Sequence, residues 1–355
     1  MTVLARYLMK SILGHTAMVL IVLLSLSSLY LFIDQQDDIG VGTYSTTDAF
    51  IFVALTLPQY AFDMLPIAAL IGALLSLGNL ARSMELVVIR AAGVSTARIG
   101  AWVFAAGVVL MASTWVLGEY VAPPMTQYGK QLKTFAKFQD YSIAANRGAW
   151  AKDGDTVISV QRQNAGNTYG GVYVFKFNPQ RRLLSIGRAQ SAKIDSDNTW
   201  LLSNYRESRI EEDRVIPTQA DSVSLATRLS PEFLGLATVE PDALSVSGLS
   251  NYIDHLRENF LDSRDYETAF WARIARTVAV SIIVVLAVPF AFGPMRSTGT
   301  GVRTVMGIMM GVAFFLLAKM MESSGEVFNM SPFLVAWTPT VLLAVITSVA
   351  VSRVR

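Results

Sequence analysis

The chain has 355 residues, of which 52% are hydrophobic and only 16% are charged. With a mean hydropathy of +0.43, it is too apolar for an ordinary soluble protein. It contains no cysteine, which excludes disulfides and thiolate metal sites. Its two histidines, His15 and His255, lie far apart in the sequence, which argues against histidine-based catalysis or metal ligation. We therefore expect no metal or other cofactor.

Six apolar runs are long enough to cross the hydrocarbon layer of a membrane, which takes about 20 residues. They are Ile12–Ile33, Met64–Leu80, Ile99–Leu117, Thr277–Phe292, Val302–Lys319 and Pro332–Val351. The first run contains no charge and is not followed by a small-residue cleavage pattern, so we expect it to remain as a helix. The sequence thus predicts three spans before a central segment and three after it.

The charges are sorted by position along the chain. Basic residues cluster in the N-terminal segment, in every second loop and in the C-terminal tail. They are Arg6, Lys10, Arg82, Arg90, Arg98, Arg296, Arg303, Arg353 and Arg355. The alternate loops are acidic, with Asp34, Asp37, Asp38 and Asp48 in one and Glu322 and Glu326 in the other. Because Lys and Arg accumulate in cytoplasmic loops, we expect both termini in the cytoplasm and the central segment outside.

The central segment, residues 121–265, has an ordinary soluble composition and is long enough to bury its own core. Its runs rich in Val, Ile, Tyr and Trp, separated by turn residues, predict strands at Thr156–Gln161, Gly171–Phe177, Leu183–Ile194 and Trp200–Ile210. Their spacing suggests an antiparallel sandwich, jellyroll or open barrel. Ser247–Asn259 is predicted to be a helix with Leu249, Ile253 and Leu256 on one face.

The predicted architecture is therefore a membrane α-helical protein, 3+3, with an inserted all-β, jellyroll-like domain. We expect three parts: transmembrane residues 1–120, the β domain with flanking helical segments at 121–265, and transmembrane residues 266–355. The β domain shows no paired-carboxylate, nucleophile–base or metal pattern. A binding or conduit module is favoured over an active site.

The loop at residues 79–95 is too charged to be a span, yet its residues favour a helix. Gly93 is a plausible end for that helix, and Arg82 and Glu85 are spaced to pair across one turn. Exposed apolar side chains at Leu86, Val87 and Ile89 would suit docking into a groove of a cytoplasmic partner. An amphipathic linker on the bilayer surface explains the same pattern equally well.

Nucleotide hydrolysis by this chain itself is excluded by the lack of a Walker A pattern. The one Gly-Lys pair, Gly129-Lys130, is followed by glutamine. A driving ATPase would have to be a separate chain.

Two groups of basic residues lie at or near membrane depth. Arg273, Arg276 and Lys319 are placed near the outer ends of spans, where they either anchor at the interface or contact an anionic lipid. Lys130, Lys133 and Lys137 form a stripe just outside the third span, which is either a solvated face or a phosphate-reading strip. The position at headgroup level favours the second reading of this stripe.

Several motifs carry a resemblance to a known family. They are Glu85-Leu-Val-Val-Ile-Arg-Ala-Ala-Gly-Val-Ser95, Glu119-Tyr-Val-Ala-Pro123, Trp150-Ala-Lys-Asp-Gly154, Asp242-Ala-Leu-Ser-Val-Ser-Gly-Leu-Ser-Asn-Tyr252 and Phe292-Gly-Pro-Met-Arg-Ser297. With the 3+3 architecture they resemble the LptF/LptG family of lipopolysaccharide export permeases, more its LptG members than its LptF members. The resemblance covers essentially the whole chain.

This resemblance implies roles for particular residues. A coupling helix at about residues 82–93 would dock on the LptB ATPase, with Arg82, Glu85, Leu86 and Arg90 as candidate coupling residues. Lys130 and Lys133 match two basic residues that approach the lipopolysaccharide headgroup. Lys137, Arg273, Arg276 and Lys319 are further candidates for headgroup contact because of their position near the outer ends of spans, independently of the resemblance. Family members often carry lysine at the outer end of the first helix, where this chain has Leu31, Asp37 and Asp38.

The resemblance also implies a mechanism. An LptF partner would complete a cavity whose lateral seams are the first and fifth spans of each permease. Lipopolysaccharide would enter from the outer leaflet of the inner membrane, and ATP binding to LptB would narrow the cavity. The lipid would then pass to the β-jellyroll domain and on to those of LptC and LptA.

Three rival functions remain open on the residues alone. They are a permease for another lipid or for a lipoprotein, a membrane-tethered sensor or scaffold whose β domain binds a periplasmic partner, and an intramembrane enzyme. A sensor would need a cytoplasmic output domain, whereas the cytoplasmic parts here are short loops. An enzyme is disfavoured because Asp63 and His15 stand alone near the ends of spans.

Overall fold

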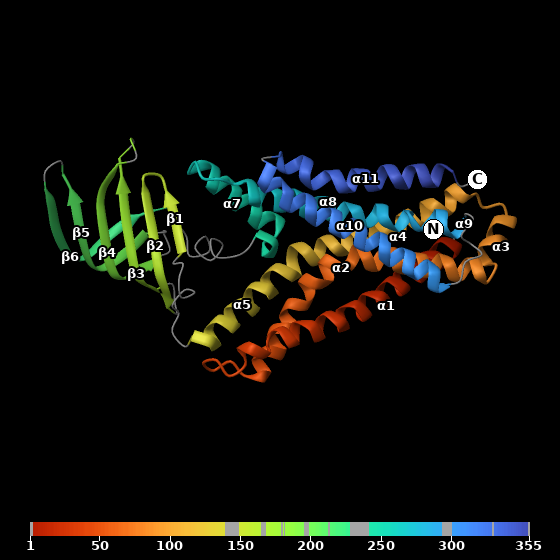
Figure 1. Ribbon diagram of the computed structural model, residues 1–355, viewed down its shortest axis with the longest axis horizontal. Helices are drawn as coiled ribbons and strands as arrows, with labels where there is room; N and C mark the ends of the chain where they lie inside the picture. Colours follow the sequence, from red (N-terminus) through yellow and green to blue (C-terminus); the bar gives the residue numbers. More distant parts are fainter. Residues whose placement is uncertain are drawn as a thin grey trace.

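The protein consists of a long helical bundle with a β-sheet at one end, and both termini lie at the opposite end of the bundle (Figure 1). The computed structural model describes residues 3–138, 149–164, 168–178, 180, 182–194, 199–211, 214–227, 241–292, 300–328 and 330–353. Most of the last motif above, at 293–297, lies outside these residues.

The helices follow the predicted spans. They are α1 (Val3–Asp34), α2 (Thr46–Arg82), α3 (Glu85–Ala91), α4 (Thr96–Val116), α5 (Ala122–Phe138), α7 (Val246–Glu258), α8 (Arg264–Val285), α9 (Ala287–Phe292), α10 (Thr300–Phe328) and α11 (Pro332–Ser352). Three short segments are η1 (Gln36–Asp38), the π-helical turn η2 (Leu117–Val121) and η3 (Pro241–Ala243).

Within the described residues, five helices are long and apolar enough to cross a membrane. They contain five of the six predicted spans, and α4 runs through η2 into α5 as one of the five. The remaining predicted span lies inside α10, a helix of 29 residues. The multi-pass architecture is thereby confirmed.

Helices α2, α4 and α7 each begin directly after a serine whose side chain caps the first turn. The side chain of Ser45 accepts a hydrogen bond from the Asp48 amide, and the Asp48 carboxylate accepts one from the Ser45 amide, which forms a capping box at the start of α2. Ser95 and Ser245 accept equivalent bonds at the starts of α4 and α7. These local bonds satisfy amide groups that lack a partner in the first turn of a helix.

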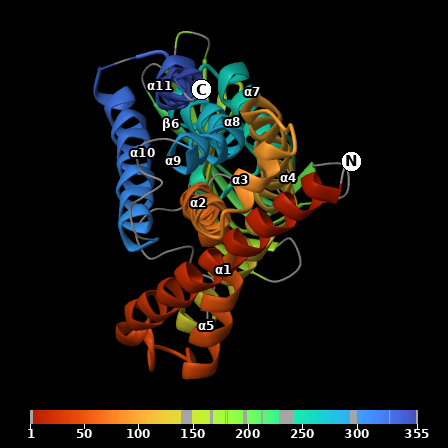
Figure 2. The same ribbon diagram turned by 90° about the vertical axis from the view of Figure 1, so that its right-hand side faces the viewer.

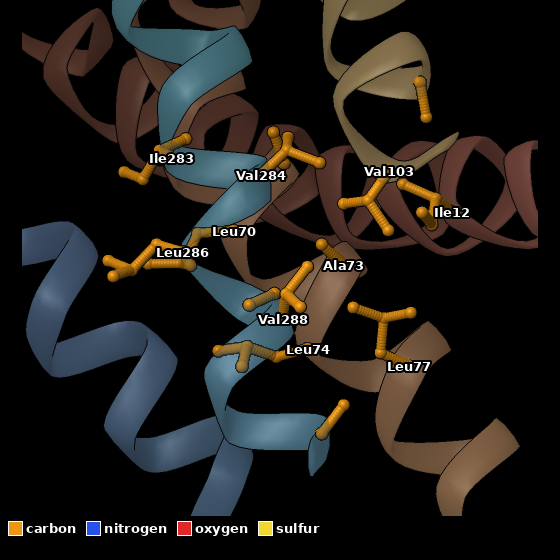
Figure 3. Close-up of a cluster of buried hydrophobic side chains, with 14 of the residues drawn as sticks. Ile12, Leu70, Ala73, Leu74, Leu77, Val103, Ile283, Val284, Leu286 and Val288 are labelled. Carbon is orange, nitrogen blue, oxygen red and sulfur yellow. The ribbon is translucent and has the colours of Figure 1, made fainter. Parts of the chain in front are cut away.

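The core of the bundle is apolar and lies where α1, α2, α4, α8 and α9 meet. Figure 3 shows side chains of these helices pointing toward one another, among them Ile12, Leu74, Val103 and Val284. Small residues allow close approach, since a Cβ at Gly107 would lie 2.9 Å from the Ser281 carbonyl oxygen. Close backbone packing of this kind is a main source of attraction between helices in a membrane.

Helices α1 and α10 lie on the periphery of the bundle when it is viewed along its length (Figure 2). Both carry large apolar side chains that face away from the protein, such as Ile21 and Leu29 on α1 and Met309 and Met320 on α10. These faces suit contact with lipid tails or with another membrane helix.

The inserted domain is one antiparallel sheet whose six strands follow each other in sequence order. The strands are β1 (Ala149–Asp153), β2 (Thr156–Asn164), β3 (Thr168–Phe177), β4 (Leu183–Ile194), β5 (Thr199–Ile210) and β6 (Val215–Ala226). All four predicted strands are present, and β1 and β6 extend the sheet at its two edges. The fold class, a helical membrane protein with an inserted all-β domain, is confirmed.

One face of the sheet is buried. Residues along β4 alternate between buried and exposed, as expected for a sheet with one wet face. Trp200 and Tyr169 are fully buried and stack with ring centroids 5.6 Å apart. The ring of Tyr205 crosses Gly187, where an added Cβ would lie 1.9 Å from its hydroxyl oxygen. This cluster is the core of the β domain.

Replacing Gly72 by alanine should loosen the α1–α2 contact. An added Cβ would lie 2.5 Å from the Thr16 backbone, which cannot yield as a flexible side chain would. Overpacking of this kind costs about 1–3 kcal/mol of unfolding free energy, which a thermal unfolding assay on the detergent-solubilised protein would detect. Gly14→Ala on α1 is the control, because nothing lies within 4 Å of its new methyl group. Equal melting temperatures for the two variants would contradict the close contact.

Candidate functional site

The loop between α2 and α4 carries the first group of candidate residues, and its helix is shorter than predicted. Helix α2 ends at Arg82, Met84 adopts a left-handed conformation with φ 59°, and α3 then runs only from Glu85 to Ala91. The expected helix at 82–93 is therefore broken before Glu85. Gly93, with φ +87°, lies just beyond its end, as predicted.

Burial on α3 differs from the expectation. Leu86 and Ile89 are only 2% and 8% exposed and pack into the bundle core, so their predicted exposure is wrong. Val87 is 49% exposed, as predicted, and its neighbour Val88 is 65% exposed. The reason is that α3 lies against the bundle, which buries residues spaced three apart and leaves the opposite face free.

The charged candidates of this loop are tied to the bundle as well. Glu85 accepts hydrogen bonds from the hydroxyls of Ser83 and Tyr7, at 2.8 and 2.9 Å, so that it connects α3 to α1. Arg90 is exposed, with its guanidinium carbon 5.9 Å from the centre of the Phe292 ring. The loop thus presents a charged and apolar surface on a well-anchored short helix.

The predicted lysine stripe lies on α5, and two of its members converge on one carboxylate. The Lys133 ammonium lies 2.7 Å from one oxygen of Asp38, and the Lys137 ammonium pairs with the other oxygen. Lys133 also lies 4.9 Å from the centre of the Phe52 ring on α2. Lys130 is half-buried on the same helix.

The turn between α1 and α2 also binds the end of α5 through its backbone. The amide and the hydroxyl of Thr43 both donate to the Ala136 carbonyl, at 2.7 and 3.0 Å. Gly42 allows this approach, since an added Cβ would lie 2.3 Å from the Lys137 carbonyl oxygen. The lysine stripe is therefore held beside the turn by ionic and backbone contacts together.

Arg273 on α8 is buried, with 6% of its surface exposed. Its guanidinium donates to the Gly118 carbonyl at 2.7 Å and to the Asp242 carbonyl at 3.1 Å. It also lies 4.6 Å from the centre of the Phe62 ring on α2. Arg273 thus joins α8, η2, η3 and α2 at the end of the bundle nearer to the β domain.

Arg276 is the centre of an ionic network. Its guanidinium lies 2.9 Å from Asp63 on α2 and 2.7 Å from Glu322 on α10. Lys319 extends the network, at 3.1 Å from both Glu322 and Asp242. The expectation that Asp63 stands alone was wrong, because Asp63 pairs with Arg276. This network connects α2, α8, α10 and η3.

A cavity of about 330 Å³ opens beside this network. It is lined by Pro241, Asp242, Asp265, Thr268, Ala269, Lys319, Glu322 and Ser323. Three carboxylates and one ammonium give it a polar character that does not suit acyl chains. The outward faces of α1 and α10, by contrast, carry large exposed apolar side chains.

The chain was compared with known proteins. Residues 6–353 match the family described as lipopolysaccharide export system permease LptF/LptG. The chain is 34% identical to lipopolysaccharide export system permease protein LptG of Escherichia coli strain K12 over 340 residues, 95% of this chain and 94% of the relative. It is also 34% identical to LptG of Haemophilus influenzae strain Rd over 351 residues, 99% of this chain and 98% of the relative.

The chain belongs to the LptF/LptG family of lipopolysaccharide export permeases. The LptG relatives agree with the resemblance drawn from the motifs, and the apolar helices fit a multi-pass permease of the inner membrane. As a member of this family, the protein is a transport permease of a lipopolysaccharide export system.

The sequence did not single out several residues that hold this permease together. The Tyr7 hydroxyl donates a hydrogen bond to Glu85. Asp38 forms ion pairs with Lys133 and Lys137, and Asp242 forms one with Lys319. Asp38 and Asp242 did lie within recognised acidic or family segments, which was a usable signal. Nothing in the local sequence of Tyr7 indicated its partner.

Removal of Arg276 should strongly destabilise the permease. Because the Arg276 side chain is only 13% exposed, Arg276→Gln would leave Asp63 and Glu322 without their shared guanidinium at a cost of about 3–5 kcal/mol. Thermal unfolding in detergent measures the effect. Adding Asp63→Asn and Glu322→Gln to the same variant should restore part of the loss, because no unpaired charge then remains.

Arg257→Gln is the matched control for this prediction. Arg257 pairs with Glu267 at 2.9 Å, but its side chain is 60% exposed, so its loss should cost no more than about 1 kcal/mol. If Arg276→Gln and Arg257→Gln lowered the melting temperature equally, the network around Arg276 would have no special role.

Proposed function

We propose that this permease pairs with LptF and extracts lipopolysaccharide from the outer leaflet of the inner membrane, driven by ATP hydrolysis in a separate LptB dimer. The observation that carries the proposal is α3. It exposes Val87 and Val88 beside Glu85, it lies at the end of the bundle opposite the β domain (Figure 1), and its other face packs into the bundle core. A short helix of this kind can receive force from a docked partner and pass it into the bundle.

The orientation follows from the charges. Arg6, Lys10, Arg82 and Arg90 lie at the α3 end of the chain's helices, so this end is proposed to face the cytoplasm. The β domain, at the opposite end, then lies in the periplasm, where it would hand the lipid to LptC and LptA. The proposed division remains 1–120, 121–265 and 266–355.

The path of the lipid is proposed to run between paired permeases. The outward apolar faces of α1 and α10 would form the lateral seams with the partner and shelter the acyl chains from water. Exposure of acyl chains costs about 0.8 kcal/mol for each CH₂ group. A dozen carbons on each of several chains therefore makes an apolar path necessary, and the ATPase supplies the drive.

The headgroup is proposed to meet the lysines of α5. Lys130 is half-buried there, and Lys133 and Lys137 bind Asp38, which a lipid phosphate could replace. Lys319, whose side chain is 39% exposed, is a further candidate at the rim. Arg273 and Arg276 have protein partners, so we assign them to holding the helices that surround the path.

Glu85→Arg should abolish ATP-dependent release of lipopolysaccharide while the complex still inserts into the membrane. The change reverses the charge beside the exposed valines of α3, where the ATPase is proposed to dock. Release from proteoliposomes to a periplasmic acceptor is the measurement, together with co-purification of the ATPase. Normal release by this variant would reject the coupling role.

Two variants separate docking from internal packing at this position. Tyr7→Phe removes the hydrogen bond to Glu85 but leaves the carboxylate, so release should stay near the wild-type level. Val88→Asp alters a side chain that is 65% exposed and should impair co-purification of the ATPase without lowering the melting temperature. A docked surface predicts this pair of results, whereas an amphipathic linker on the bilayer does not.

Lys130→Glu combined with Lys133→Glu should weaken photo-crosslinking of the permease to lipopolysaccharide, because two attractive charges become repulsive to phosphate. Lys193→Glu on the exposed side of β4 is the control for the change in charge and should have no effect. Asp38→Asn removes the carboxylate that Lys133 and Lys137 share, and it should preserve or raise crosslinking. Unchanged crosslinking in the double variant would mean that the lysine stripe is only a solvated face and does not bind the headgroup.

A further inference from the structure

Helix α7 touches the membrane helices at one end and the β domain at the other (Figure 1). We propose that Glu119 is a positioning residue that couples the movement of α4 to the β domain by holding the first turn of α7. This inference rests on the proposed function, in which α3 receives the force of the ATPase, and it names the route by which that force reaches the periplasmic side.

The contact at the start of α7 is specific. One carboxylate oxygen of Glu119 accepts from the Val246 amide at 2.8 Å. The other accepts from the amide and the hydroxyl of Ser247, at 3.1 and 2.6 Å. Ser245 satisfies the next amide, that of Gly248, at 3.0 Å. A side chain more than 120 residues away in sequence thus completes the cap of this helix.

Electrostatics favour the same arrangement. The amide groups at the start of a helix carry a partial positive charge, which attracts a carboxylate. Hydrogen bonds to a charged acceptor are shorter and stronger than those between neutral groups. The contact therefore resists both separation and rotation of α7 relative to Glu119.

The position of Glu119 is set by the π-helical turn η2. Turns of this type are rare, and they often occur at functional sites. The carbonyl of Gly118 in this turn accepts from Arg273, and an added Cβ at Gly118 would lie 2.5 Å from the Phe62 ring. Because η2 follows α4 without a break, a tilt of α4 moves Glu119 with it.

The other end of α7 holds the hairpin between β1 and β2. The side-chain oxygen of Asn259 accepts from the Gly154 amide at 2.8 Å, and its carbonyl accepts from the Lys152 ammonium at 3.0 Å. The His255 ring nitrogen lies 3.1 Å from the Lys152 carbonyl oxygen. Gly154, with φ +59°, forms the turn itself.

The helix between these two ends is short and supported along its side. Its 13 residues span roughly 20 Å, which is stiff at the scale of a domain. Leu249 and Ile253 pack against Tyr266, Ala269 and Phe270 of α8. A continuous link therefore runs from α3 through α4, Glu119 and α7 to the edge of the sheet.

The test uses the assembled complex with its ATPase in proteoliposomes. Glu119→Ala should leave ATP hydrolysis and lipopolysaccharide crosslinking at α5 unchanged. It should lower transfer of the lipid to the β domain, read by crosslinkers on the buried face of the sheet, by about tenfold or more, the scale of losing hydrogen bonds to a charged group. Glu119→Gln keeps one acceptor oxygen, so its transfer of the lipid should lie between that of the wild type and that of Glu119→Ala.

A double-mutant cycle tests whether the contacts at the two ends of α7 act together or independently. Asn259→Ala acts at the opposite end of α7 and should give the same loss of transfer, and combining it with Glu119→Ala should add little. Asp254→Ala, which removes an exposed carboxylate from the middle of α7, is the matched control and should transfer normally. Losses that add fully would mean that the two ends act independently, which overturns the proposal.

If Glu119→Ala folds poorly, a covalent crosslink between positions 119 and 247 can take the place of the hydrogen bonds. The chain has no cysteine, so Glu119→Cys with Ser247→Cys introduces a unique pair. Joining the pair with a short reducible thiol crosslinker should restore transfer, and a reductant should abolish it again. Transfer that is indifferent to the crosslink would also overturn the proposal.

These outcomes are separable from failure of the proposed function. Normal lipid release by Glu85→Arg would show that α3 does not couple to the ATPase, which is the premise of this inference. If Glu85→Arg blocks release but Glu119→Ala transfers normally, the ATPase coupling stands and the route through α7 is rejected.

Discussion

The pairing of charge inside an apolar helical bundle is the constraint on which the rest of the structure depends. An ionised side chain away from water is tolerated only when partners lie close to it. Arg276 therefore lies between Asp63 and Glu322, and Arg273 donates to two backbone carbonyls. Because these partners belong to α2, α10, η2 and η3, satisfying two guanidinium groups of α8 determines how these segments meet near the β domain.

The middle of the bundle is held by a different kind of contact. Glycines bring helices together there, and the cluster in Figure 3 contains only apolar side chains. Such contacts are short-ranged and allow small sliding, whereas the ionic contacts at the end are directional. The proposed mechanism uses this combination, because in it the outer apolar faces move while the charged groups stay paired. The described outward faces of α1 and α10 carry exposed apolar side chains such as Ile21 and Met309.

Among the residues that the structure describes, polar contacts at the two ends of α7 connect the β domain to the membrane helices. Glu119 binds the start of α7, and Asn259 binds the hairpin that begins the sheet. Hydrogen bonds at a helix terminus preserve an orientation, because their donors point along the helix axis. The family motifs around Glu119, Lys152 and Asp242, which seemed unrelated in the sequence, lie together at this junction.

The sequence alone determined the elements, since these depend on local properties. The length of each apolar run predicted the spans, the turn residues bounded β4 at Leu183–Ile194, and helical spacing identified the buried face of α7. The family motifs predicted the class of permease. Only the tertiary structure decided which side chains meet: Asp63 and Arg276 are 213 residues apart, and Leu86 is buried although its neighbours suggested exposure. Such pairings depend on which helix faces come together in space, and spacing along the chain carries no record of that.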